Sequence, residues 1–243
     1  IDWLVKMKRL PKEHMLDTAL KEGTVRSEWV GNAAEKLAEF YVDSKPVYNL
    51  DQRELRGGIM RDIEINSAAL LNNNFKLDHA LIVGITTDLL HFMIKRADLF
   101  VQRIAGGRIL DAHGDLRPEH ICLGPIPVII DRLEFNGELR IMDVAEELAF
   151  LELECEMLGN ASTGRVFLDV YCLKSGDNIP EMLIHFYKVK RALLRAKLSI
   201  NHLLEGKYLV DAGKWRGRCD AYLQVAAAYC KKTENLLIWK INL

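Results

Sequence analysis

The chain has 243 residues, which suffices for one or two domains and for a core that needs neither disulfides nor structural metals. Its 33 Lys and Arg against 34 Asp and Glu give a formal charge of −1, which argues against a basic surface for non-specific binding of nucleic acid. No apolar run approaches the roughly 18 residues of a membrane span, and charged residues interrupt the opening segment where a signal peptide is apolar. The sequence therefore predicts a cytoplasmic protein with no membrane or nucleic-acid partner.

The first hundred residues are predicted to be helical. Apolar residues recur at three- and four-residue steps over 27–42, which predicts a helix with Ser27 as a possible cap. The stretch 51–71 has a weaker helical period and ends in three asparagines, a turn signal. One long helix is then expected from a cap at Asp78 to a stop at Gly106-Gly107.

The period changes after this stop. Three short apolar runs, 108–112, 121–123 and 128–130, are broken by Gly and Pro and are too brief for helices, so they predict short strands around a loop. Further helices are predicted over 141–158 with Asp143 as the cap, over 162–173, over 181–204 and within the tail 211–243. This order predicts a single domain over residues 1–243 that is mainly α with a small β insert.

The predicted loop after the first strand is rich in groups that titrate or bind metal. It reads Asp111-Ala112-His113-Gly114-Asp115-Leu116-Arg117-Pro118-Glu119-His120, and Asp131 ends a later apolar run. Phosphoryl transfer needs a carboxylate that accepts or orients the attacking hydroxyl, and oxygen ligands that hold magnesium against the phosphates. Asp115 would be the base, Asp131 would be a magnesium ligand, and Gly114 would let the chain turn without a Cβ clash.

These residues resemble the aminoglycoside phosphotransferases and choline kinase relatives, which share the protein-kinase-like fold. His113-Gly114-Asp115 and the strand that ends in Asp131 look like the catalytic loop and the metal-binding strand of that family. The likeness extends to 132–151 and 191–197, where the chain is similar to a little-characterised bacterial branch. In that branch such a domain is often joined to a separate nucleotide-binding domain.

The resemblance implies the C-terminal lobe of a protein-kinase-like (α+β) fold. Its hinge region would be residues 1–20, its catalytic and metal-binding loops 108–131, and its C-terminal helices 141–206. Because the resemblance begins at the hinge, the N-lobe that covers the nucleotide and supplies a phosphate-binding Lys is expected to be missing. We therefore expect a fragment that is inactive by itself.

The activity implied by the resemblance is an ATP- and Mg²⁺-dependent transfer of phosphate to a hydroxyl group of a small molecule. Asp115 and His113 would be the catalytic residues, Asp131 would bind the metal, and Asp143 would support the catalytic loop from the following helix. His120 stands where the family usually has an Asn that binds the metal. Imidazole is a poorer ligand for magnesium than an amide oxygen, so this position departs from the pattern.

Two other functions stay open at this point. His113, Asp115 and His120 have a loop spacing that suits a transition metal, which would make the chain a metal-dependent hydrolase. A non-catalytic kinase-like binding module is the other alternative, because of His120 and the missing lobe.

Two helix faces carry charge in the sequence. Lys188, Arg191 and Arg195 fall at i, i+3 and i+7, which predicts either a solvated surface or a docking face for an anionic substrate or partner. The acidic residues of the helix predicted over 141–158 are expected to form a mostly solvated face. They are Glu146, Glu147, Glu152, Glu154 and Glu156.

Overall fold

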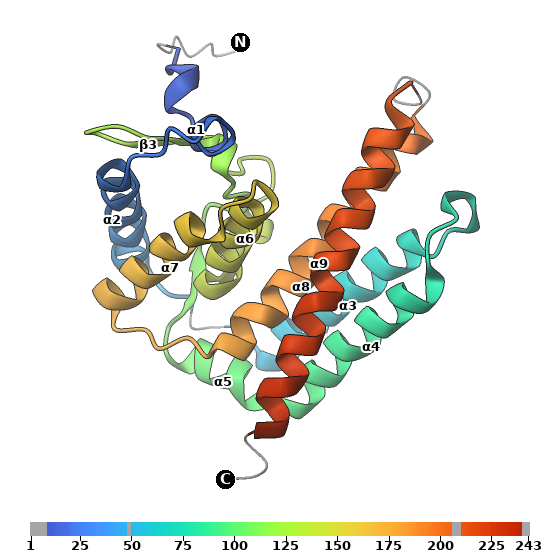
Figure 1. Ribbon diagram of the computed structural model, residues 1–243. Coiled ribbons are helices and arrows are strands. Elements are labelled where there is room, and N and C mark those ends of the chain that lie inside the picture. Colours follow the sequence, from blue (N-terminus) through green and yellow to red (C-terminus); the bar gives the residue numbers. More distant parts are fainter. Residues whose placement is uncertain (1–8, 48–49, 206–209, 240–243) are drawn as a thin grey trace, which may run out of the picture. The chain divides into compact units, whose positions relative to one another are not determined.

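The computed structural model describes residues 9–47, 50–205 and 210–239 (Figure 1). The described chain is mainly helical and has two small two-stranded sheets, which confirms the predicted class of mainly α with a small β insert. The α-helices are α1 (Leu16–Glu22), α2 (Ser27–Asp43), α3 (Gln52–Leu70), α4 (His79–Lys95), α5 (Ala97–Ala105), α6 (Val144–Met157), α7 (Ala161–Ser175), α8 (Glu181–Asn201) and α9 (Ala212–Trp239). The strands are β1 (Ile109–Asp111), β2 (Ile121–Cys122), β3 (Val128–Ile129) and β4 (Ile141–Asp143).

The chain divides into two compact units that are each formed from separate segments. Unit 1 comprises Ile1–Lys45, Asp111–Met142 and Phe150–Asn178. Unit 2 comprises Pro46–Leu110, Asp143–Ala149 and Ile179–Leu243. The single domain expected over 1–243 stays a prediction, and of its predicted hinge, residues 1–8 lie outside the described residues.

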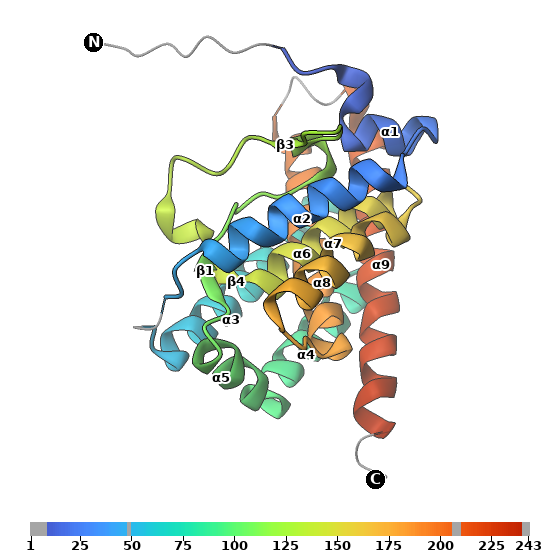
Figure 2. The same ribbon diagram turned by 90° about the vertical axis from the view of Figure 1, so that its left-hand side faces the viewer.

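Unit 1 contains helix α2 packed along α7, and both helices run side by side in Figures 1 and 2. Tyr41 and Tyr171 meet edge to face between these helices, with 5.7 Å between ring centroids. On α7, Gly164 allows a close approach to the second half of α6, because a Cβ atom there would lie 2.5 Å from the Cα of Glu152. The packing of these helices therefore depends on a glycine at this crossing.

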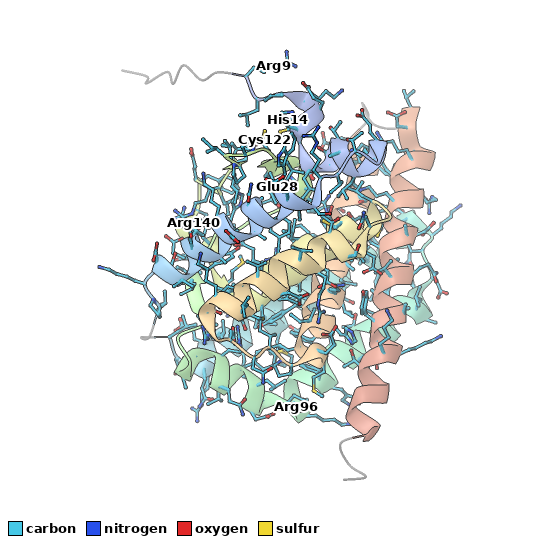
Figure 3. The ribbon with its side chains drawn as sticks, turned by 60° about the vertical axis from the view of Figure 1, so that its left-hand side comes forward. Arg9, His14, Glu28, Arg96, Cys122 and Arg140 are labelled. Carbon is cyan, nitrogen blue, oxygen red and sulfur yellow. The ribbon has the colours of Figure 1, made fainter. Side chains whose placement is uncertain are left out.

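Unit 1 also holds the β2–β3 hairpin, in which Ile121 pairs with Ile129 and Cys122 with Val128. The segment before α1 lies against β2, where the backbone N–H of Leu123 donates to the carbonyl of His14 at 2.7 Å. Figure 3 shows His14 and Cys122 close together at this contact. This hydrogen bond thus joins the hairpin to the N-terminal segment of unit 1.

Unit 2 is built around α8 and α9, which run in opposite directions beside each other, with α3 and α4 packed against them (Figure 1). Aromatic rings fill its core: Phe92 of α4 stacks on Phe186 of α8 with 4.8 Å between centroids, and Phe100 of α5 meets Phe186 edge to face at 5.5 Å. Aromatic pairs of this kind stabilise a core beyond their buried area.

Most predicted elements are confirmed, with three corrections. The single long helix expected from Asp78 is two helices, α4 and α5, because the backbone leaves the helical region at Arg96. Asp78 does cap α4 by accepting a bond from the N–H of Leu81 at 3.0 Å. Ser27 is the first residue of α2 and not its cap. Strand β4 was not predicted, because its residues were assigned to the start of the following helix.

Helix α9 forms the C-terminal part of the described chain. The tail was predicted to contain one more helix, and α9 confirms it, while the expected frayed or strand-like end at 240–243 lies outside the described residues. Among the residues that the structure describes, no helix combines the length and the apolar character that a membrane crossing requires.

Candidate active site

The predicted catalytic loop connects β1 to β2 in unit 1 and turns at Gly114. This glycine has φ +91, which side-chain-bearing residues rarely adopt. A Cβ atom there would lie 3.0 Å from the Cβ of Leu133 and 3.1 Å from the Cγ of Arg140. The predicted need for a residue without a Cβ is confirmed, because the turn is both in a glycine conformation and covered by a second segment.

That second segment, 130–133, is bonded to the loop through His113. The Nε2 atom of His113 lies 2.7 Å from the carbonyl oxygen of Ile130 and must donate to it. The Nδ1 atom then accepts, and it receives the backbone N–H of Asp115 at 3.4 Å. The carbonyl of His113 in turn accepts from the N–H of Leu133 at 3.0 Å. The buried His113 ring therefore joins the two segments that carry the predicted catalytic and metal-binding aspartates.

The bonds of His113 bear on two expectations. Both ring nitrogens face backbone groups, so His113 holds the loop in the structure, while its catalytic role stays a prediction. The hydrolase set of His113, Asp115 and His120 is not assembled in the structure, since both ring nitrogens of His113 contact backbone groups. In the described part of the chain, no three His, Cys, Asp or Glu side chains form a cluster that could hold a metal.

His120 is held as firmly as His113. Its Nδ1 lies 2.7 Å from the carbonyl oxygen of Asp115 and must donate, which leaves a lone pair on Nε2. Its ring stacks on that of His113 at 5.8 Å with an angle of 19° between the planes. Its carbonyl accepts from the N–H of Ile130 at 3.0 Å. Two ring contacts thus fix the orientation of Nε2, and a backbone bond holds the residue.

Asp131 lies next to this lone pair. One of its oxygens, Oδ2, is 3.9 Å from the Nε2 of His120, while its side chain is 70% exposed. The backbone of Asp131 has φ +58, the left-handed region that few non-glycine residues occupy. An unusual backbone conformation therefore places an exposed carboxylate beside an oriented imidazole.

Asp115 is the third predicted site residue, and Arg117 holds its side chain. Nε and Nη2 of Arg117 lie 3.1 and 2.9 Å from Oδ2 of Asp115, and Nη1 lies 2.6 Å from Oε1 of Glu119. The Nη2 atom is also 3.3 Å from Nε2 of His120. Both ionic contacts of Asp115 thus use Oδ2, and Arg117 joins Asp115, Glu119 and His120.

Asp111 anchors the other end of the loop. Its Oδ1 is 2.7 Å from Nε of Arg140 and 2.7 Å from Nη2 of Arg132. Arg132 also donates to the carbonyl of Ala112 at 3.0 Å, and Arg140 donates to that of Leu133 at 2.7 Å. The hydrogen bond from Arg140, with further stabilisation from Arg132, lowers the pKa of Asp111. Two arginines therefore bind the segment after β3 to the start of the catalytic loop, and Arg140 is labelled in Figure 3.

The sequence interpretation missed these arginine partners. Arg117, Arg132 and Arg140 each stand within a few residues of a carboxylate in the sequence, which was the only available signal. That signal does not say which carboxylate each arginine binds, because the pairs with Asp111 span 21 and 29 residues.

Asp143 belongs to unit 2 and has a different role from the predicted one. Its carboxylate receives Arg103 at 2.7–3.1 Å, the hydroxyl of Tyr187 at 3.0 Å and the backbone N–H of Ala145 at 2.9 Å. The last bond confirms Asp143 as the cap of α6. Its side chain was expected to support the catalytic loop; instead its bonds join α5, α6 and α8. Burial, with Asp143 alongside, raises the pKa of Tyr187 well above its usual value.

The predicted basic face of α8 is not a solvent-facing surface. Lys188 is 2% exposed and its Nζ donates to the hydroxyl of Tyr229 at 2.8 Å. Arg191 is also buried and lies 2.8 Å from Oε1 of Glu146. Arg195 is half-buried and its Nε lies 3.4 Å from the hydroxyl of Tyr222. This docking-face prediction is wrong, because these cations are paired inside unit 2.

The solvated acidic face predicted for α6 is also wrong. Four of its five glutamates are buried, and Glu156 alone is half-buried. Glu146 shows the reason, since its Oε1 lies 2.8 Å from Nζ of Lys190 and 2.8 Å from Nε of Arg191. Burial raises the pKa of Glu146, but these two cations outweigh burial and the pKa is lowered. The carboxylate stays ionised and acts as the anion of a buried cluster.

Comparisons with known proteins give relatives but no family. No protein-family model matches the chain, and no solved structure matches it. "Uncharacterized protein Rv2004c" of Mycobacterium tuberculosis (strain ATCC 25618 / H37Rv) is 31% identical over 206 residues, which are 84% of this chain and 41% of the relative. "Uncharacterized protein Mb2027c" of Mycobacterium bovis and "Uncharacterized protein MT2060" of M. tuberculosis (strain CDC 1551 / Oshkosh) match with the same values. The chain thus spans about two-fifths of the length of these relatives.

Proposed function

We propose that the chain is the C-terminal lobe of a protein-kinase-like phosphotransferase that moves phosphate from ATP to a hydroxyl group of a small molecule. The observation that carries the proposal is the joining of two segments by His113, which brings the carbonyl of Asp115, the ring of His120 and the carboxylate of Asp131 together. A base and a metal-binding pair on adjacent, rigidly connected segments are the equipment that phosphoryl transfer needs.

In this proposal Asp115 accepts the proton of the substrate hydroxyl. Arg117 binds its Oδ2 and thereby orients the carboxylate, so that Oδ1 is the oxygen that takes the proton. The side chain is 36% exposed, which leaves it open to a substrate. His113 contributes by fixing the loop through the carbonyl of Ile130 and does not touch the substrate.

Asp131 and His120 would hold the divalent ion that ATP-dependent transfer uses. Two donor atoms about 2.1 Å from one ion lie at most about 4.2 Å apart, and the distance of 3.9 Å between Nε2 and Oδ2 falls within that limit. Two protein ligands suit an ion that takes its other ligands from water and phosphate oxygens. When bound, such an ion neutralises the charge of the phosphates and aligns the transferred group.

A protein-kinase-like fold needs a second lobe to cover the nucleotide, so the test uses the longest open reading frame that contains this chain. ATP consumption would be measured with magnesium, and separately with manganese, and a panel of small hydroxyl compounds. We expect Asp115→Asn to lower kcat by about 10²–10⁴-fold, because a general base contributes that much. The matched control is Asp169→Asn, since Asp169 is an exposed, arginine-paired aspartate on α7.

Two results would contradict the proposal. An unchanged rate in the Asp115→Asn variant would remove Asp115 from the chemistry. No ATP consumption with magnesium or manganese and any acceptor, from a folded protein that still binds a ligand or a protein partner, would favour a non-catalytic binding module instead.

A further inference from the structure

The pair formed by His120 and Asp131 differs from a typical magnesium site in one donor atom. We propose that this pair binds a first-row transition-metal dication, with Mn²⁺ as the best match, in preference to Mg²⁺, and that His120 sets the preference. The inference takes from the proposed function only that the pair holds a divalent ion, and it does not require that phosphate is transferred.

The donor set is the first argument. Magnesium prefers oxygen ligands in a strict octahedron, whereas imidazole nitrogen suits first-row transition metals. The Nδ1 of His120 donates to the carbonyl of Asp115, so the atom that faces Asp131 is the unprotonated Nε2. The pair therefore offers one nitrogen and one carboxylate. Among transition metals, Mn²⁺ accepts the carboxylate, water and phosphate oxygens that would complete such a shell.

The rigidity of His120 is the second argument. Its ring is 7% exposed, stacks on His113 and donates to a backbone carbonyl at 2.7 Å. A ligand that is fixed by a hydrogen bond from its other ring nitrogen is typical of metal-binding histidines. The hydrogen bond and the ring contact oppose a rotation that would leave magnesium with oxygen ligands alone. The nitrogen is therefore a fixed part of the site and not an optional ligand.

Arg117 is the competing cation, because its Nη2 also contacts Nε2 of His120. Its contact with Nε2 of His120, at 3.3 Å, is longer than its contacts with Asp115 at 2.9 Å and Glu119 at 2.6 Å. An ion on Nε2 replaces only this longest contact. The ion pairs with Asp115 and Glu119 still hold the guanidinium when this contact is replaced.

Replacing His120 by Asn removes the nitrogen ligand and leaves the other groups of the site unchanged. The Asn amide N–H can still donate to the carbonyl of Asp115, and its carbonyl oxygen offers magnesium a hard ligand. The His120→Asn variant is thus expected to keep a divalent site and to lose the preference for Mn²⁺. Asp131→Asn removes the only charged ligand and is expected to weaken both ions.

The experiment measures metal binding by the 243-residue chain. Free Mn²⁺ is followed by its EPR signal, and Mg²⁺ is added as the competitor. We expect wild type to bind Mn²⁺ at least about tenfold more tightly than Mg²⁺, and His120→Asn to reduce this ratio by about tenfold or more. The matched control is His91→Asn, which changes an exposed histidine of α4 in unit 2 and should leave the ratio unchanged.

Three outcomes would overturn the inference: equal affinity for the two ions in wild type, an unchanged ratio in His120→Asn, or no bound ion at millimolar concentrations in a chain shown to be folded by circular dichroism. The phosphotransferase proposal fails separately. Preferential Mn²⁺ binding without ATP turnover would leave the metal site standing and remove the enzyme, whereas turnover with equal use of both ions would do the reverse.

Discussion

The two units each contain a cluster of carboxylates, and the clusters differ in how completely they are paired. In unit 2, Asp143 is 3% exposed and accepts bonds from Arg103, Tyr187 and Ala145. In unit 1, Asp131 is 70% exposed, and its Oδ2 lies 3.9 Å from Nε2 of His120. A buried charge is costly unless it is fully paired, whereas an exposed one can keep bonding capacity for a ligand. The incomplete cluster is therefore the candidate for function, and the complete one holds helices together.

Glu146 extends the cluster of unit 2 and follows the same rule. Lys190 and Arg191 reach one of its oxygens at 2.8 Å, and Lys190 is also 3.7 Å from Asp62. Glu146, Lys190 and Arg191 are thus each matched by an opposite charge. The comparison predicts that substitutions in the buried cluster change stability, and that substitutions in the exposed cluster change ligand binding.

The largest effect is expected from Asp143→Ala. It removes the partner of a buried arginine, and loss of one member of a buried ion pair costs about 3–5 kcal/mol of unfolding free energy. Denaturant unfolding followed by circular dichroism measures it. The control is Tyr187→Phe, which removes one hydrogen bond to the same carboxylate and should cost about 1 kcal/mol. A loss below about 1 kcal/mol for Asp143→Ala would show that Arg103 is readily hydrated.

Gly114→Ala is expected to have the next largest effect. The residue has φ +91, and a non-glycine residue in such a conformation costs about 1–3 kcal/mol. The new Cβ would also meet Leu133 at 3.0 Å, which places the total near the upper end of that range. Gly57→Ala is the matched control, because Gly57 lies in α3 with open space around it and should gain about 0.5–1 kcal/mol. Equal effects of both substitutions on the denaturation midpoint would contradict the described turn.

The pH dependence of stability tests the partly exposed ion pairs of Asp111. Arg140 first, and Arg132 with it, lower the pKa of this carboxyl in the folded state. The stabilisation is therefore complete above the unfolded pKa of about 3.9 and disappears as the pH falls through the folded pKa. Asp111→Asn should cost at most about 1 kcal/mol at pH 7, because the side chain is 44% exposed. The difference from wild type should shrink in titrations below about pH 4, and a constant difference would refute this linkage.

The parts of the fold that sequence could predict are those fixed by local chemistry. Asp78 and Asp143 cap helices through the backbone N–H of residues two or three positions ahead, so a capping residue before an apolar period is sufficient to place them. Gly and Pro likewise placed β1, β2 and β3. The break at Arg96 was missed, because the apolar period continues across it from α4 into α5.

The parts that sequence could not predict depend on residues far apart in the chain. Lys188 was assigned to a solvent-facing surface, but its partner Tyr229 stands 41 residues later, on α9. The loop from Asp111 to His120 was identified as the chemical centre from its composition alone. Its internal bonds were not, because His113 reaches Ile130 across 17 residues and a spacing does not specify which nitrogen points where. Composition therefore located the candidate site, and only the structure separated its positioning residues from those with free bonding capacity.

The smallest effect on stability, and the sharpest contrast with Asp143, is expected from Asp131→Asn. Asn tolerates the left-handed backbone of this position as well as Asp does, and no close ion pair is lost, so the free energy of unfolding should change by less than about 0.5 kcal/mol. The same variant should lose the rise in Tm that a divalent ion gives to wild type, because a ligand stabilises the folded state only where it binds. Thermal unfolding with and without Mn²⁺ measures both quantities in one experiment. A loss of more than about 1 kcal/mol without metal would place Asp131 among the paired carboxylates and remove the difference between the two clusters.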